Sequence, residues 1–306
     1  MTREFHTLIN SEDLVAASRR AEKLVLLDCR TVLGAPDAGP AAWAAGHIAG
    51  AVHANLETQL AAPAHSKPGN LGGRHPLPER EKFSRQCGAW GIDATTQVVA
   101  YDDAGGAYAA RAWWLLRWLG HSLVAVLDGG LDSWTRLATG TLVSSEADTA
   151  ERPTPVRFVA REPLTRIAEL AEIQALAANP DGQPTTHLID ARAQERFTGQ
   201  VEPIDPVAGH IPSALCMPLT GNLDNTGHFL GPAQLASRFN SNNSLDSSNG
   251  ENLICYCGSG VTAAHNILAI CHAGLPEPAL YVGSWSEWCA DSTRPIEVGE
   301  AASQRD

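Results

Sequence analysis

Four segments of the first half of this sequence recur, in the same order, in the second half. Asp28 recurs as Asp190 after 162 residues, and the position of Asp102 recurs as Cys257 after 155 residues. Changes in loop length are enough to explain this difference in spacing. The partners are LVLLDCR (24–30) and THLIDAR (186–192), GHIAGAVHANL (46–56) and GHIPSALCMPL (209–219), VVAYDDAGGAYAAR (98–111) and LICYCGSGVTAAH (253–265), and LDGGLDSW (127–134) and YVGSWSEW (281–288). The chain is therefore predicted to be a duplication, with two domains of one fold.

Each half alternates strand-like and helix-like stretches. LVLLD and HLID are short apolar runs without polar alternation, which is typical of buried parallel strands. Two later stretches carry apolar residues at helical spacing and end at Gly120 and Gly274, the usual position of a helix stop. The pattern predicts an α/β fold with two tandem domains, each a parallel sheet flanked by helices.

The domain boundaries follow from composition. A chain of 306 residues has room for two domains of about 150 residues. The stretch 139–156 is rich in Ser, Thr, Glu and Pro, as linkers are. We expect a first domain over 1–140, a linker over 141–156 and a second domain over 157–306, with a flexible surface loop over 240–250.

Charge and cysteine usage narrow the class of protein. Asp plus Glu total 34 against 22 Lys plus Arg, and a net charge of −12 argues against nucleic acid or an anionic membrane as partner. No apolar run reaches 18 residues and the N-terminus lacks the apolar core of a signal peptide, which predicts a cytoplasmic protein. Seven scattered cysteines, an odd number, are expected to be thiols.

Cys257 is the candidate nucleophile. It follows the strand LICY, two glycines allow the backbone amides of the next residues to turn inward, and a helix begins near Thr262 or Ala263. Those amides belong to Gly258, Ser259, Gly260, Val261 and Thr262. With a helix N-terminus aimed at it, a thiol there should be held partly as thiolate. The alternative is a Gly-rich turn with an incidental thiol. The repeat favours function, because its first copy has Asp102, which cannot act as a sulfur nucleophile.

Two other uses of a cysteine loop fail on spacing. A cysteine phosphatase needs an arginine six residues after the cysteine, and that position is Ala263. Zinc binding by Cys255 and Cys257 would need a second ligand pair, and none is nearby. Cys255 should point to the opposite face of the sheet. We expect neither a metal nor a cofactor.

The motifs DAR, GHIP, CGSGVTA and GSWSEW, in a chain of two halves, resemble the tandem-domain rhodanese-type sulfurtransferases over nearly the whole length. The resemblance implies an inactive first domain, an active second domain with its site between the two, and a persulfide on Cys257. The loop CGSGVT is similar to that of 3-mercaptopyruvate sulfurtransferases, whereas thiosulfate sulfurtransferases usually carry basic residues there. It implies a small sulfur donor and, as acceptor, thioredoxin, another dithiol or cyanide.

The same resemblance suggests roles for single residues. It places Arg196, in DARAQERF, at the donor carboxylate. It places His75, in GGRHPLP, near the cysteine, where His75, Ser259 and an acid would form a proton relay. The family's acid is Asp, and Glu57 stands at the matching position. Arg192 is assigned either to substrate binding or to a structural ion pair.

The donor remains open at this stage. The family's mercaptopyruvate enzymes usually have a second substrate arginine before GHIP, yet 198–212 contains no basic residue. Thiosulfate is therefore the alternative donor, and Arg74 beside His75 could help to hold a dianion. A third hypothesis is a non-catalytic persulfide carrier or regulatory module.

Residues that recur in both halves are expected to be structural, because one half has no nucleophile. This applies to His47 and His210 in GHI and to Trp134 and Trp288 at the ends of the last repeated segment.

Overall fold

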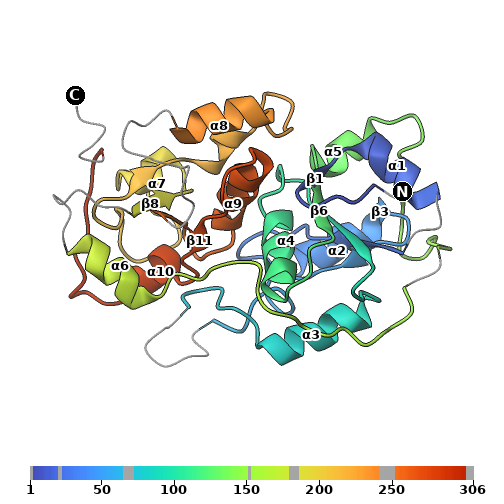
Figure 1. Ribbon diagram of the computed structural model, residues 1–306, viewed down its shortest axis with the longest axis horizontal. Coiled ribbons are helices and arrows are strands. Elements are labelled where there is room, and N and C mark those ends of the chain that lie inside the picture. Colours follow the sequence, from blue (N-terminus) through green and yellow to red (C-terminus); the bar gives the residue numbers. More distant parts are fainter. Residues whose placement is uncertain are drawn as a thin grey trace. The chain divides into compact units, whose positions relative to one another are not determined.

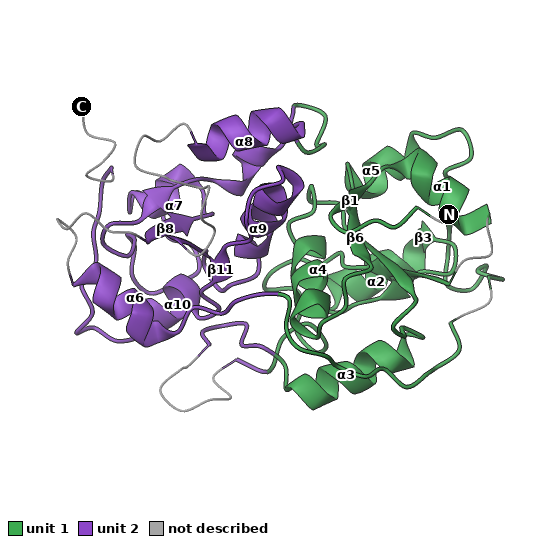
Figure 2. Ribbon diagram, viewed as in Figure 1, with its two compact units in different colours: residues 1–62, 78–164, 225–229 green, residues 63–77, 165–224, 230–306 purple. Residues whose placement is uncertain are grey.

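The protein forms two compact units (Figure 2). The computed structural model describes residues 3–19, 23–64, 72–150, 153–178, 186–240 and 252–300. Unit 1 comprises Met1–Ala62, Pro78–Leu164 and Asn225–Phe229, and unit 2 comprises Pro63–Leu77, Thr165–Asp224 and Leu230–Asp306. Each unit thus takes a short segment from the other half of the sequence. The segment that joins unit 2 carries Arg74 and His75.

Unit 1, which is mostly blue and green in Figure 1, contains a five-stranded parallel sheet in the order β1-β6-β5-β2-β4. Its strands are β1 (Leu8–Ile9), β2 (Leu24–Asp28), β4 (Val52–His53), β5 (Gln97–Tyr101) and β6 (Val124–Leu127). The helices are α1 (Ser11–Arg19), α2 (Ala38–Ala45), α3 (Arg80–Ala89), α4 (Ala109–Trp118) and α5 (Gly130–Thr135). Helix α4 packs on β5 and β6, and all but two of its residues are buried.

Unit 2 contains a four-stranded parallel sheet in the order β11-β10-β8-β9. Its strands are β8 (His187–Asp190), β9 (Leu215–Cys216), β10 (Leu253–Tyr256) and β11 (Ala279–Leu280). The helices are α6 (Leu170–Ala177), α7 (Gln194–Phe197), η2 (Leu219–Asn222), α8 (Pro232–Asn240), α9 (Ala263–His272) and α10 (Ser284–Trp288). The order matches β6-β5-β2-β4 of unit 1, so the predicted α/β fold with a parallel sheet in each half is confirmed.

The register of the strands brings the chemistry-bearing residues to one edge of each sheet. Asp28 pairs with Tyr101 at the carboxyl ends of β2 and β5, and Asp190 pairs with Tyr256 at the ends of β8 and β10. Cys257 directly follows β10. From β8 the chain continues to β9 and from β10 to β11, which lie at opposite ends of the sheet. Parallel α/β sheets form their binding crevices at such a switch point between neighbouring strands.

The two halves also share their internal contacts. The Nη2 atoms of Arg30 and Arg192 each donate to a repeat-related carbonyl oxygen at 2.7 Å, that of Gly46 and that of Gly209. His47 and His210 are both fully buried, and the Nδ1 of each lies 2.8 Å from a backbone carbonyl. Trp134 and Trp288 lie in the apolar cores of their units. The recurring residues therefore have the structural role expected of them.

The stretch expected to be the linker makes specific contacts within unit 1. Strand β7 (Leu142–Val143) pairs antiparallel with β3 (His47–Ile48). The Asp148 carboxylate accepts from the Gly50 amide at 3.1 Å and lies 3.1 Å from Nε2 of His47. Of the predicted loop over 240–250, Asn240 ends α8 and the rest lies outside the described residues. Among the helices that the structure describes, none has the length and apolar character needed to cross a membrane.

Limited proteolysis tests the predicted boundary. Cutting within 139–156 would release two fragments that each contain one sheet, and this is the result expected from the composition of the stretch. Resistance of 139–156, with the first cut elsewhere, would place the boundary outside that stretch. Mass spectrometry of the fragments identifies the cut.

Candidate active site

The loop after β10 surrounds Cys257. The cysteine is 1% exposed, and helix α9 begins six residues later at Ala263, as the sequence indicates. Gly260 has a φ of +71°, and a Cβ there would lie 2.2 Å from the carbonyl oxygen of Val282. Only glycine allows this tight turn, which carries the backbone around the sulfur into the helix.

Residues of helix α10 make hydrogen bonds to the first residues of the loop. The amide of Trp285 donates to the carbonyl of Cys257 at 3.0 Å, and the amide of Ser286 donates to the carbonyl of Gly258 at 2.9 Å. The amide of Cys257 itself donates to Oγ of Ser284 at 3.1 Å. The first two peptide groups of the loop are thus fixed before any substrate binds.

The first half shows what such a loop binds. The Asp102 carboxylate, in the position of Cys257, is completely buried and accepts four backbone hydrogen bonds. The donors are the amides of Ala104 (2.9 Å), Gly106, Tyr108 and Ala109 (2.8 Å each). A strand-loop-helix turn of this protein therefore forms a cradle for an anion, as converging amides and a helix N-terminus should. The repeat predicts a similar arrangement of the amides of Gly258 to Thr262 around Cys257, and this arrangement stays a prediction.

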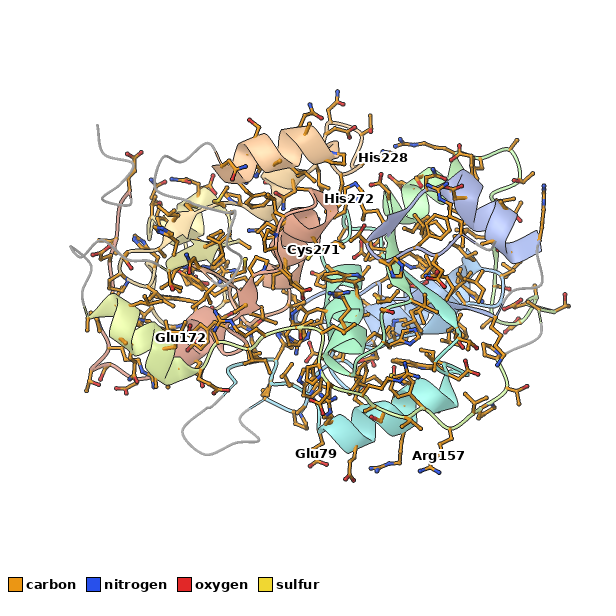
Figure 3. The ribbon with its side chains drawn as sticks, viewed as in Figure 1. Glu79, Arg157, Glu172, His228, Cys271 and His272 are labelled. Atoms are coloured by element: carbon orange, nitrogen blue, oxygen red, sulfur yellow. The ribbon has the colours of Figure 1, made fainter. Side chains whose placement is uncertain are left out.

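The other buried thiols lie in surroundings that suppress reactivity. Burial raises the pKa of Cys216 to about 12 and that of Cys289 to about 11. It also raises the pKa of Cys29, Cys87 and Cys255 far above the usual range. Cys271 is partly exposed, but it lies near the C-terminal end of α9, opposite the end that faces the loop (Figure 3). The five buried thiols outside the loop are therefore poor nucleophiles.

Ser259 and His75 are brought together in unit 2. The Nδ1 atom of His75 lies 2.7 Å from Oγ of Ser259, and both side chains are buried. The segment that carries His75 is fastened to α10, because the amide of Arg74 donates to Oγ of Ser286 at 3.0 Å and the amide of Gly72 donates to Glu287 at 2.8 Å. A hydroxyl and an imidazole at this distance can pass a proton.

Glu57, the predicted acid of the relay, belongs to unit 1. It lies in a turn in which its amide donates to the side chain of Asn55 at 2.9 Å. Its part in the relay stays a prediction.

Two guanidinium groups lie beside the loop. A Cβ on Gly258 would lie 3.3 Å from Nη2 of Arg74 and 3.5 Å from both Nη1 and Nη2 of Arg196. Both side chains are partly exposed, at 26% and 18%. They supply the cations that the neutral loop lacks, one residue from the sulfur.

These arginines are held by two acids that the sequence analysis did not single out. Glu202 accepts from Arg196 at 2.7 and 3.1 Å, while Asp205 accepts from Arg196 at 3.2 Å and pairs with Arg74. Burial opposes ionisation of Glu202, but the hydrogen bonds from Arg196 and the amides of Asp205 and Ile204 lower its pKa on balance. The carboxylates orient the guanidinium groups and cancel much of their charge.

Of the two alternatives for Arg192, the structure shows the ion pair, and a part in substrate binding stays a prediction. Its side chain is 1% exposed, and its Nη2 lies 2.7 Å from the carboxylate of Asp190. Its guanidinium carbon also lies 4.8 Å from the centre of the Trp285 ring. Arg30 and Asp28 form the same pair in the half without a nucleophile, at 2.6 Å, which shows that the pair serves the fold.

The sequence contains features that point to Glu202, Asp205 and Ser284, which the sequence analysis did not single out. Glu202 and Asp205 are the acids of the stretch noted for its lack of basic residues. Ser284 stands where the first copy has Gly130, a difference visible once YVGSWSEW is aligned with LDGGLDSW. Among the described residues, no group of His, Cys, Asp and Glu side chains could hold a metal ion.

The chain is similar in sequence and in structure to known proteins. The family model of the rhodanese-like domain matches residues 11–137 and 172–291. The chain is 45% identical over 294 residues to a Pseudomonas aeruginosa protein named "Probable 3-mercaptopyruvate sulfurtransferase", covering 96% of this chain and 98% of that one. It is 37% identical over 232 residues to the thiosulfate sulfurtransferase of Mus musculus, covering 74% of each chain. The crystal structure of SseA from Escherichia coli matches with a TM-score of 0.72 and 28% identity, over 92% of this chain and 100% of that one.

The chain therefore belongs to the rhodanese family, with two rhodanese-like domains in tandem. The resemblance seen in the motifs is confirmed.

Proposed function

We propose that this protein is a sulfurtransferase that takes sulfur from 3-mercaptopyruvate onto Cys257 and passes it to a thiol or to cyanide. The observation that carries the proposal is the anion cradle around Asp102, whose counterpart in unit 2 contains a thiol. Four amides that hold a carboxylate in one copy can hold a thiolate or a persulfide anion in the other.

The reaction follows from the groups at the loop. The Cys257 thiolate attacks the donor sulfur, a sulfur–sulfur bond forms, and the carbon–sulfur bond breaks with its electron pair left on the enolate of pyruvate. Ser259 and His75 can deliver the proton that converts the enolate into pyruvate. An acceptor thiolate then attacks the outer sulfur of the persulfide, and Cys257 leaves as thiolate. The loop amides stabilise the sulfur anion in both steps.

The charges beside the loop support 3-mercaptopyruvate over thiosulfate. Arg74 and Arg196 can bind a carboxylate, but Glu202 and Asp205 already neutralise them. The dianion thiosulfate gains less electrostatic binding energy from such a neutral cluster than it would from two unpaired cations. A single carboxylate can still bind through the remaining N–H donors of the two arginines. Thiosulfate stays the alternative donor, and the two guanidinium groups at Gly258 are the observation that favours it.

The donor preference is tested by steady-state kinetics. We expect a higher kcat/KM with 3-mercaptopyruvate than with thiosulfate, each measured with a dithiol and with cyanide as acceptor. Measurable turnover of either donor excludes a passive persulfide carrier, which would not need Ser259, His75 and Arg196 together. A higher kcat/KM with thiosulfate would reverse the donor assignment and leave the persulfide mechanism intact.

Asp205 should set the preference between the donors. In Asp205→Asn the ratio of kcat/KM for thiosulfate to that for 3-mercaptopyruvate should rise about fivefold, since one extra unit of charge at about 4 Å in a watery site is worth about 1 kcal/mol. Asp291→Asn removes the same charge from an exposed position of unit 2 and should leave the ratio unchanged. An unchanged ratio in Asp205→Asn would show that Asp205 does not affect donor choice.

The thiols and the need for a thiol acceptor suit a reducing compartment. The cysteines of the described residues form no disulfide bond. Disulfides are rare in the cytosol because thioredoxin and glutathione keep thiols reduced. We place the reaction in the cytoplasm, with thioredoxin or a small dithiol as acceptor.

A further inference from the structure

Ser284, at the start of α10, has an unusual backbone conformation for a residue with a side chain. Its φ is +53°, in the left-handed region, and among the described residues only one other non-glycine residue, Ser213, has a positive φ. The repeat supplies a direct comparison, because Ser284 aligns with Gly130, whose φ is +55°. The inactive copy thus has glycine, the residue this conformation favours, and the active copy has a residue that it strains.

The hydroxyl of Ser284 makes two hydrogen bonds that glycine cannot make. It accepts from the amide of Cys257 at 3.1 Å and donates to the carbonyl of Tyr281 at 2.9 Å. Ser284 is completely buried, so these two hydrogen bonds are shielded from solvent. The hydroxyl connects the nucleophile to the residue that follows β11.

The other contacts between α10 and the loop do not depend on side chains. The bonds to the carbonyls of Cys257 and Gly258 come from backbone amides, and unit 1 has the counterpart of the first, with the amide of Leu131 donating to the carbonyl of Asp102 at 2.9 Å. The fold of the turn therefore does not need the serine. The copies differ in the hydroxyl of Ser284, which accepts a hydrogen bond from the amide of Cys257.

We propose that Ser284 is a positioning residue for catalysis, which holds the Cys257 backbone so that its sulfur faces the loop amides and the donor. The proposal rests on the proposed function of Cys257. A free amide at Cys257 would let the first peptide group of the loop rotate and displace the nucleophile from its attack geometry. Small displacements of a reacting atom are costly in rate, while the arginines that bind the donor are unaffected. The loss should appear in kcat and not in KM.

The test compares Ser284→Gly with the parent protein in sulfur uptake from 3-mercaptopyruvate. Gly130 shows that this turn accepts glycine, so the variant should fold. We expect kcat to fall roughly tenfold with KM for the donor unchanged, as for loss of an interaction that serves the transition state. Ser284→Ala keeps the strained backbone and loses the hydroxyl, and should lose kcat to a similar extent. Ser213→Gly relaxes the other left-handed serine and should retain parental kinetics.

The results separate the inference from the proposed function. A parent protein that never forms a persulfide on Cys257 would contradict the proposed function itself. If the parent forms it and Ser284→Gly reaches the parental kcat, the hydroxyl has no positioning role. Should KM rise with kcat unchanged, the positioning role is equally excluded. Circular dichroism and Tm measured on each variant establish that the compared proteins are folded.

Discussion

Cys257→Ser should abolish sulfur uptake. The sulfur of Cys257 is the only atom of the loop 257–262 that can form a sulfur–sulfur bond, and a serine hydroxyl cannot replace it. We expect turnover to fall by at least about a thousandfold, as when other covalent enzymes lose their nucleophile. Intact-mass spectrometry after treatment with the donor should show one added sulfur on the parent protein and none on the variant.

Cys271→Ser is the matched control, because it removes a partly exposed thiol from the far end of α9. It should take up sulfur at the parental level. Peptide mapping of the loaded parent decides the location: sulfur found on Cys255 would overturn the assignment to Cys257. The strongly raised pKa of buried Cys255 makes that outcome unexpected.

Arg196→Ala should reduce kcat/KM for 3-mercaptopyruvate by roughly ten- to a hundredfold. A charged hydrogen bond to a carboxylate is worth about 1.5 to 3 kcal/mol, and Arg74 remains beside Gly258 to provide part of the binding. The effect on thiosulfate should be smaller. Arg196→Lys keeps the charge without the planar fork and should fall between the parent and the alanine variant.

Arg166→Ala is the control for this prediction. Arg166 pairs at 3.0 Å with Glu172, which projects from α6 (Figure 3), so the variant also removes an arginine from a carboxylate in unit 2. Its kinetics should match those of the parent. Equal losses in Arg196→Ala and Arg166→Ala would mean that Arg196 acts through general stability and does not bind the donor.

The α/β fold and the bounds of one strand in each half were accessible from the sequence because both depend on local signals. Short apolar runs predict buried strands wherever they occur, and LVLLD and HLID became β2 and β8 without a change of bounds. Glycines mark tight turns for the same local reason. Because the chain is duplicated, its two halves can be compared. The comparison shows that Cys257 stands where the first half has Asp102, and that His47 and His210 recur and are therefore expected to be structural.

The partners of charged side chains were not accessible in this way. Arg192 and Arg196 lie four residues apart in one motif, yet Arg192 is buried on Asp190 while Arg196 lies beside the loop. Spacing alone does not distinguish them, because an ion pair depends on which side chains the fold brings within reach.

By itself, the sequence determined the duplication and the α/β architecture, and it predicted the cysteine loop that only one copy has, since each of these is written in contiguous residues. Only the tertiary structure decided that 63–77 joins unit 2 and brings His75 to Ser259, that Glu202 and Asp205 neutralise the arginines, and that Ser284 holds the amide of Cys257. These contacts join residues up to 184 positions apart in the chain. Local propensity carries no information about such pairs, because the packing of distant segments creates them.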